Sequence, residues 1–186
     1  MGASNVTTGK PKVVGGIYTA PKGTTLPTDA VTALAAAYKS AGYIAEGGVT
    51  NSNSPETTSL KAWGGDVVYV TTTGKEDNFS FGYLETMDAD VLKLVYGNAN
   101  VTGTLATGIA VTANAKEAEE RVYVIEMILR DGALKRIVIP DGKITAVGDI
   151  VYSDTDVTQY PMTIAALADA SGNTHYEYIK AAGSGS

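Results

Sequence analysis

The sequence predicts a mainly β protein, an antiparallel β-sandwich or barrel with one or two short helices and a long extended loop. Two observations favour this class. Tyrosine is abundant, with 11 residues against 2 phenylalanines, and tyrosine, valine and threonine suit the pleated, half-buried surface of a sheet. The second half of the chain also consists of short strand patterns separated by turn residues, which is typical of sandwiches and barrels. The 186 residues correspond to one domain, taken as residues 1–182, with a linker at 183–186.

The first third of the chain is predicted to hold an arm, a strand and a helix. Residues 1–12 are polar and are expected to form a mobile N-terminal arm, and residues 13–19 form a short strand. A helix is expected over residues 30–39, because Thr28 or Asp29 can accept hydrogen bonds from its first turn. The apolar residues that would share one face of this helix are Val31, Leu34, Ala35 and Tyr38.

The middle of the chain contains the most unusual segment. Residues 42–66 are polar and nearly free of aliphatic side chains, yet they carry the only tryptophan, Trp63. Loops of this length in compact domains usually serve binding or are disordered. A strand is expected at residues 66–73, followed by a turn at 74–77 and a strand at 78–84 that pairs back.

A second helix is predicted over residues 89–96. Asp88 can cap its N-terminus, and Gly97 ends it. A helix of this length is not stable alone in water, so it must pack on a sheet.

The second half predicts antiparallel strands. Asp131–Gly132 is a strong hairpin signal between residues 121–130 and 134–140. Both faces of the strand at 121–130 are largely apolar, so it should be covered on each side. Asp141–Gly142 is expected to form a further turn. The remaining strands are expected at residues 144–152, 158–167 and 174–179.

Composition excludes most catalytic chemistry. The chain has no cysteine and one histidine, His175, which removes thiolate sites, disulfides and multi-histidine metal sites. The sequence has no nucleophile elbow, zinc-protease helix or glycine-rich phosphate loop. His175 is interpreted as structural, and no metal, cofactor or catalytic residue is predicted.

The charge is acidic and unevenly distributed. Residues 1–75 hold six basic and four acidic side chains, whereas residues 76–186 hold eight basic and sixteen acidic ones. A chain of this charge lacks the positive surface of a nucleic-acid binder. The asymmetry would suit head-to-tail contacts between copies. No apolar run is long enough to span a membrane, and no membrane contact is predicted.

Two segments resemble a known family. Residues 15–30 (GGIYTAPKGTTLPTDA) and 42–66 (GYIAEGGVTNSNSPETTSLKAWGGD) resemble the major tail protein, or tail tube protein, of bacteriophages with long non-contractile tails. The resemblance covers about the first hundred residues, and the rest agrees only in strand pattern. It implies a structural subunit of the virion tail, with no enzymatic activity, assembled in the host cytoplasm into stacked hexameric rings.

The resemblance also implies partners and contact residues. The partners would be further copies of the chain, the tape measure protein, the tail terminator and the baseplate or distal tail proteins, with DNA passing through the lumen. The loop at 42–66 and the arm at 1–12 would bridge rings, with Tyr43, Trp63 and Asp66 at the interface between subunits. From the residues alone, Trp63 could instead close the loop onto its own domain.

The acidic second half suits the wall of a DNA conduit, because negative charge repels the phosphates and keeps DNA mobile. The candidates for lumen-facing residues are Glu117, Glu119, Asp154 and Asp156.

Three alternatives remain open at this point. The chain could be the inner-tube protein of a contractile or type VI secretion-like system. It could also be a monomeric β-sandwich module whose tryptophan loop grips a ligand, or an enzyme without recognised motifs.

Overall fold

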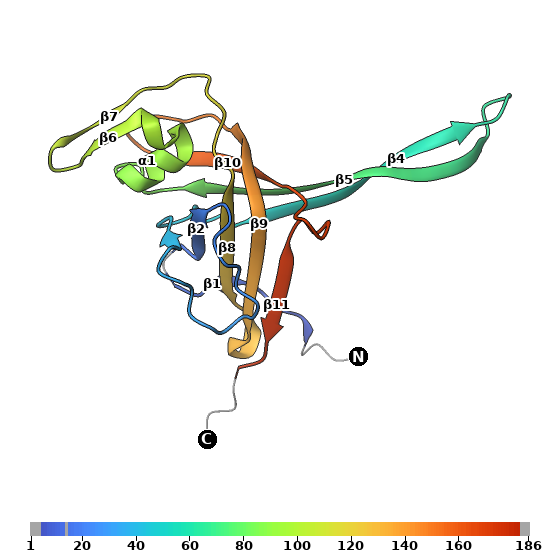
Figure 1. Cartoon of the computed structure of the whole chain (residues 1–186), viewed down its shortest axis with the longest axis horizontal. Coiled ribbons are helices and arrows are strands. Elements are labelled where there is room, and N and C mark those ends of the chain that lie inside the picture. Colours follow the sequence, from blue (N-terminus) through green and yellow to red (C-terminus); the bar gives the residue numbers. More distant parts are fainter. Residues whose placement is uncertain (1–4, 14, 183–186) are drawn as a thin grey trace.

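The computed structural model describes residues 5–13 and 15–182, and it confirms a mainly β fold with antiparallel strands (Figure 1). The predicted linker at 183–186 lies outside the described residues. The strands are β1 (Lys10–Pro11), β2 (Ile17–Pro21), β3 (Lys39–Ser40), β4 (Thr50–Lys61), β5 (Val67–Tyr83), β6 (Val101–Thr104), β7 (Gly108–Val111), β8 (Arg121–Ile128), β9 (Leu134–Val147), β10 (Tyr160–Ala166) and β11 (Tyr176–Lys180). The helical elements are α1 (Ala89–Tyr96) and the 3-10 turns η2 (Asn98–Asn100) and η3 (Arg130–Gly132).

Most strands belong to one antiparallel sheet in the order β3-β2-β8-β9-β10-β5-β4, while β6 and β7 form a separate hairpin. Two strands, β8 and β9, each pair with two different strands, one after the other, along the same edge. The first part of β9 pairs with β11 and its last part with β10. Similarly, β8 pairs first with β2 and then with β1. Because of this, strands of the same sheet can run in very different directions.

The main core lies where the two parts of the sheet face each other. In Figure 1, β5 and β10 cross β8 and β9 at a steep angle. Helix α1 adds Val91, Leu92 and Leu94 to the core. The other buried residues of this core include Ile17, Phe79, Phe81, Tyr83, Tyr123, Ile125, Ile137, Ile139, Tyr160, Met162 and Ile164. The predicted packing of the second helix on a sheet is therefore confirmed.

A second, smaller core covers the opposite face of β8. Val122 and Val124 on β8 pack there with Val138 of β9 and with Tyr38 from the connection between β2 and β3. The prediction that the strand at 121–130 is covered on both faces is confirmed, and both covers come from within the subunit.

The helix predicted at 30–39 is wrong; this stretch consists of turns and bends that lead into β3. The Asp29 carboxylate does accept hydrogen bonds from the backbone N–H groups of Val31 and Thr32, at 2.6 Å each. However, the carbonyl oxygens of Asp29 and Thr32 accept hydrogen bonds from Arg136 at 2.7 and 2.8 Å. In a helix the same carbonyls would bond N–H groups four residues on, so the chain closes a local turn over Arg136 instead. A hydrogen bond from the Thr32 side chain is the largest cause that lowers the pKa of Asp29 to about 2.

Helix α1 matches the prediction in both its bounds and its caps. The Asp88 carboxylate accepts hydrogen bonds from the N–H groups of Asp90 (2.7 Å) and Val91 (3.2 Å). At the other end, the N–H of Gly97, with φ 94°, donates to the Lys93 carbonyl oxygen.

Asp88→Ala is expected to lower the free energy of unfolding by about 0.5–2 kcal/mol, because two first-turn N–H groups lose their acceptor. Urea denaturation followed by circular dichroism measures this loss. Asp88→Asn, which keeps an acceptor oxygen, serves as the matched control and should restore most of the stability. Equal losses in both variants would contradict the capping role.

One predicted turn is confirmed and two are wrong. Asp131 and Gly132 both have positive φ, at 57° and 77°, and they reverse the chain between β8 and β9. In contrast, β5 runs without a break through residues 74–77, and β9 runs through Asp141–Gly142. Gly142 is required there for close packing, since a Cβ atom would lie 2.6 Å from the Tyr123 ring.

The described part of the N-terminal arm lies against the sheet. Lys10 and Pro11 form β1, which pairs with β8. The Arg130 N–H also donates a hydrogen bond to Thr7 Oγ1 at 2.7 Å. Within the predicted arm, Lys10 and Pro11 thus pair with the sheet, and residues 1–4 lie outside the described residues. The mobility of the arm stays a prediction.

Candidate assembly surfaces

A long hairpin projects from the body, and it replaces the predicted loop. Residues 50–61 of the loop form β4, which pairs along its length with β5. Residues 62–66 are the turn that closes the hairpin (Figure 1). β5 pairs with β10 only from residue 78 onward. The stretch 53–77, in which Asn53 is the β4 partner of Asp77, therefore forms a two-stranded ribbon beyond the body, and residues 50–52 join it to the body. The free part of β5, 67–77, spans roughly 35 Å at about 3.3 Å per residue. We call residues 50–77 the outer hairpin.

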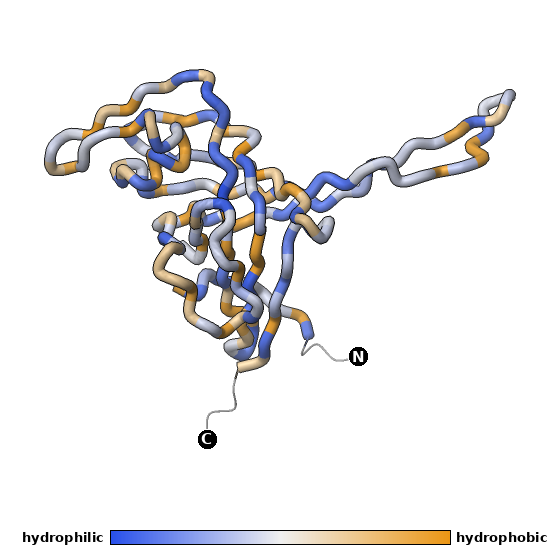
Figure 2. Tube along the Cα trace, viewed as in Figure 1, coloured by the Kyte–Doolittle hydropathy of each residue, from blue (hydrophilic) through white to orange (hydrophobic). Residues whose placement is uncertain are grey.

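The far end of the outer hairpin is apolar and uncovered. Figure 2 shows hydrophobic residues on both strands near the tip and a hydrophilic stretch nearer the body. Leu60 pairs with Tyr69 across the strands. These side chains and their neighbours are exposed by more than half of their surface: Leu60, Val67, Val68, Tyr69 and Val70. Neighbours along a strand point to opposite faces, so both faces of the ribbon end carry apolar side chains.

The backbone of the outer hairpin also has no strand partner along its outer edges within the described residues. Within the described residues, 67–77 pair only with β4, and the other edge of β4 has no strand partner. Long unpaired edges are templates for pairing with another chain. A two-stranded hairpin is at best marginally stable in water without further cover.

Trp63 lies in the tip and is fully exposed. The alternative in which this ring closes the loop onto its own domain is therefore wrong. The tip is shaped by hydrogen bonds from Ala62 N–H to the Asp66 carbonyl (2.8 Å) and from Gly65 N–H to the Ala62 carbonyl (3.0 Å). Gly64 and Gly65 have φ of 115° and 100°. These backbone conformations favour glycine.

Tyr43 does not lie with Trp63 and Asp66. Its N–H donates a hydrogen bond to Glu85 Oε1 at 2.9 Å, and the neighbouring Ile44 bridges Tyr83 in the body. The Tyr43 side chain is about half exposed and lines a depression beside β1. The predicted interface residues thus fall on two surfaces, the tip of the outer hairpin and the body.

A buried polar cluster marks the point where the outer hairpin joins the body. The Asp77 carboxylate accepts hydrogen bonds from Asn51 Nδ2 (2.8 Å), Thr174 Oγ1 (2.5 Å) and His175 Nδ1 (2.5 Å). His175 also packs edge-on against Phe79, with ring centroids 5.3 Å apart. This geometry supports a structural role for His175.

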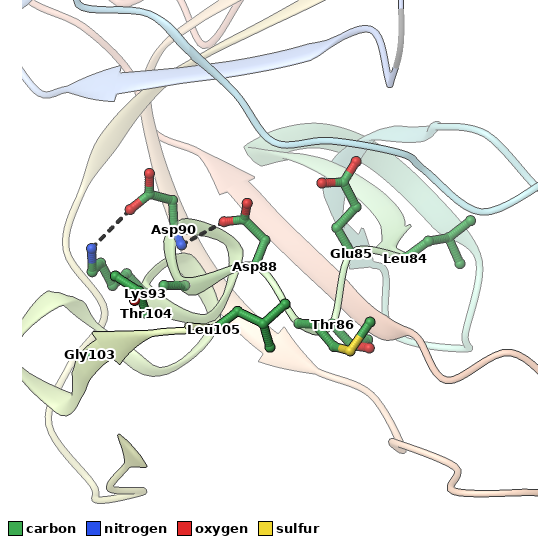
Figure 3. Close-up of a pocket in the computed structure, with 11 residues that line it drawn as sticks. Leu84, Glu85, Thr86, Asp88, Asp90, Lys93, Gly103, Thr104 and Leu105 are labelled. Atoms are coloured by element: carbon green, nitrogen blue, oxygen red, sulfur yellow. Dashed lines mark hydrogen bonds and ion pairs between the residues drawn. The ribbon is translucent and has the colours of Figure 1, made fainter. Parts of the chain in front are cut away.

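A second exposed apolar region lies at the opposite end of the molecule from the outer hairpin (Figure 1). An open groove of about 640 Å³ separates the start of α1 from the β6–β7 turn. Figure 3 shows the Leu105 side chain extending from that turn toward the residues that precede α1. Met87 and Leu105 are each about two-thirds exposed. Carboxylates at the groove include Asp88, which caps α1, and Asp90, which pairs with Lys93 at 2.9 Å.

The four predicted lumen residues come from two connections, 112–120 and 148–159, and they differ in environment. Glu117 pairs with Lys143 at 3.0 Å. Glu119 accepts a hydrogen bond from Asn98 at 2.7 Å and lies 3.5 Å from Arg121.

Asp154 and Asp156 are exposed and form no ion pair with another described residue. Of the four, these two carry charge that no described cation offsets.

The sequence interpretation missed the apolar run at residues 67–70 and the Asp77 cluster. The strand predicted at residues 66–73 includes this run, but β-branched and aromatic residues indicate a strand without indicating which of its faces are covered. The Asp77 cluster joins residues 97 and 98 positions apart, and no local pattern connects them. Within the described residues, no helix combines the length and hydropathy needed to cross a membrane.

Comparison with known proteins agrees with the resemblance. A search among curated proteins finds no match. The family model of the phage tail tube protein matches residues 7–184, which is nearly the whole chain and includes both cores and the outer hairpin. This family is structural and not enzymatic, and its members form the tail of the virion by self-assembly. The chain belongs to the phage tail tube protein family.

Proposed function

We propose that this chain is the repeating subunit of a long non-contractile phage tail, forming stacked hexameric rings through which the genome passes. The observation that supports this most directly is the outer hairpin. Its end carries Trp63 and an apolar run on both faces, and its strand edges lack partners among the described residues. Burying these groups against identical subunits would satisfy them in a limited, directed way.

The placement of the exposed regions supports head-to-tail contacts. The outer hairpin and the groove beside α1 lie at opposite ends (Figure 1). Contacts between different surfaces of identical subunits give a ring if the rotation closes and a filament if it does not. A ring that stacks through a second contact gives a tube.

Electron microscopy of the purified protein over a concentration series tests this proposal. Rings or tubes with six-fold symmetry are the expected result, in the absence or presence of an initiator complex from the same tail. Rings of another symmetry would refute the hexamer. Monomers under all these conditions would favour the binding module, and a contractile sheath around the tube in the virion would favour the contractile system.

The partners proposed for the assembled tube are the tape measure protein inside it, the terminator at one end and the baseplate or distal tail proteins at the other. Assembly is proposed to occur in the host cytoplasm. Immunogold labelling of virions with antibodies to this chain should decorate the tail along its length.

Asp154 and Asp156 are the preferred wall residues of the lumen. The double variant Asp154→Lys, Asp156→Lys is expected to slow DNA ejection, because positive side chains bind phosphate at every ring. Ejection from variant virions is measured by DNA release after receptor addition. Glu46→Lys, at an exposed position of the body, is the control for reversing a charge outside the proposed wall. Normal ejection through intact tubes of the double variant would contradict the wall assignment.

A further inference from the structure

The cluster around Asp77 holds the base of the outer hairpin to the body through side chains. Asp77 is the last residue of β5 before its pairing with β10 begins at Asn78. Its side chain has no exposed surface, although it carries a charged group. A buried carboxylate is costly unless hydrogen bonds satisfy it, so the surrounding donors must be held in place.

The three donors come from different parts of the chain. Asn51 lies on β4, while Thr174 and His175 lie in the connection just before β11. The carboxylate thus ties both strands of the outer hairpin to a segment that continues into β11, which itself pairs with β9. Burial alone would raise the pKa of Asp77, but the three hydrogen bonds outweigh burial and lower it, as expected for a carboxylate held in its charged form.

The ribbon beyond this point has no other support within the described residues. Strand pairs twist, and a two-stranded ribbon twists more freely than a wide sheet. A rotation of about 10° at Asp77 would therefore displace the tip, roughly 35 Å away at about 3.3 Å per residue, by about 6 Å, which is more than the separation of two atoms in contact.

We propose that Asp77 is a positioning residue that fixes the angle at which the outer hairpin leaves the body. Thr174 and His175 hold the body side of this contact, and Asn51 holds the second strand. The consequence for tube formation rests on the proposed function: a hairpin held at a fixed angle presents its tip to the next copy in the orientation that the contact requires. The angle itself is a property of the single subunit.

The absence of cysteine allows a direct measurement of this angle. Cysteines introduced at Thr71 on the outer hairpin and Lys180 on β11, both exposed, accept spin labels for pulsed electron paramagnetic resonance. The parent protein should give one narrow distance distribution as a monomer. Asp77→Asn should broaden or shift it, because an amide presents donors where three donors already point. A second label pair at Lys39 and Lys180, both in the body, should be unchanged.

Matched variants separate an effect on the angle of the outer hairpin from an effect on the stability of the subunit. Glu76→Ala removes a neighbouring exposed carboxylate and should leave the distribution narrow. Thr174→Val removes one donor at constant shape and should broaden the distribution, whereas Thr174→Ser should preserve it. If Asp77→Asn fails to fold, the Thr174 pair still decides the matter. Distributions identical to the parent in Asp77→Asn and Thr174→Val would overturn the proposal, whether or not the parent forms tubes.

Discussion

Arg136→Met is expected to lower the free energy of unfolding by about 3–5 kcal/mol, the usual cost of removing one partner from a buried ion pair. Arg136 is 1% exposed, and its Nε donates to Glu126 Oε1 at 2.9 Å. A second guanidinium nitrogen also bonds Glu126. Among the described residues, the substitution leaves the buried Glu126 carboxylate with Lys12 as its one cationic partner, at 3.4 Å.

The same substitution removes the support of the connection between β2 and β3. The carbonyl oxygens of Asp29 and Thr32 lose the donors that hold this segment over the smaller core. Hydrogen exchange in residues 22–38 should therefore rise more than in β5 or β10. Urea denaturation measures the global loss.

A double variant provides the control for this experiment. Glu126→Met combined with Arg136→Met removes both charges, so it should recover a large part of the lost stability, because no unpaired buried charge remains. Arg136→Lys keeps the charge but not the fork that reaches three acceptors, so its stability should be intermediate. If the free energy of unfolding of Arg136→Met lies within about 1 kcal/mol of the parent value, the ion pair contributes little to stability.

Trp63→Ser is expected to abolish or strongly weaken assembly while leaving the subunit folded. The Trp63 side chain is fully exposed in the subunit. Its removal should therefore change the free energy of unfolding by no more than about 0.5 kcal/mol. A tryptophan at the centre of a contact between proteins is worth about 2 kcal/mol or more. That corresponds to a roughly thirty-fold weaker contact, and the loss recurs at each subunit of the tube.

The critical concentration for tube formation, measured by sedimentation, reports this effect. Val68→Ser, on the apolar run of the outer hairpin, should act in the same direction. Ile179→Ser on β11 replaces an equally exposed apolar residue outside the outer hairpin and should assemble like the parent. Equal critical concentrations for Trp63→Ser and Ile179→Ser would show that the tip is not a contact.

Local signals predicted the elements whose local and tertiary preferences agree. Helix α1 has an N-cap, an apolar face and a glycine stop that all favour the same bounds. The turn at Asp131–Gly132 forms because both residues adopt the positive φ that this pair tolerates. The predicted cover on both faces of β8 followed from its apolar residues, and the two cores confirm it.

Tertiary contacts decided the elements that the sequence interpretation missed. Residues 30–39 have an acceptor and an apolar face, but Arg136 donates to the carbonyl oxygens of Asp29 and Thr32, 107 and 104 positions away, which a helix would need. Residues 74–77 look like a turn, yet Gly74 does not have positive φ and Asp77 bonds a distant segment. β4 has almost no apolar residue, because the subunit itself covers neither of its faces.

Of the candidate surfaces, too, the sequence predicts some residues and not others. Trp63 could be selected because a single large ring in a polar stretch is unusual. The comparison of Trp63→Ser with Ile179→Ser decides whether Trp63 contacts other subunits, and the interface roles of Tyr43 and Asp66 stay predictions. The Asp77 cluster could not be anticipated, since its donors are polar residues of ordinary types whose proximity only the fold creates.

The far end of the hairpin contributes no side chain to either core of its own subunit. Substitutions there are consequently free of the constraint that folding places on the rest of the chain. Under the proposed assembly, only the matching surface on a sister molecule selects among them. Two lineages could keep the same body and drift apart at this one protrusion. During coinfection of one bacterium, the subunits of the two lineages would then assemble into separate tails and would not block each other's polymerisation.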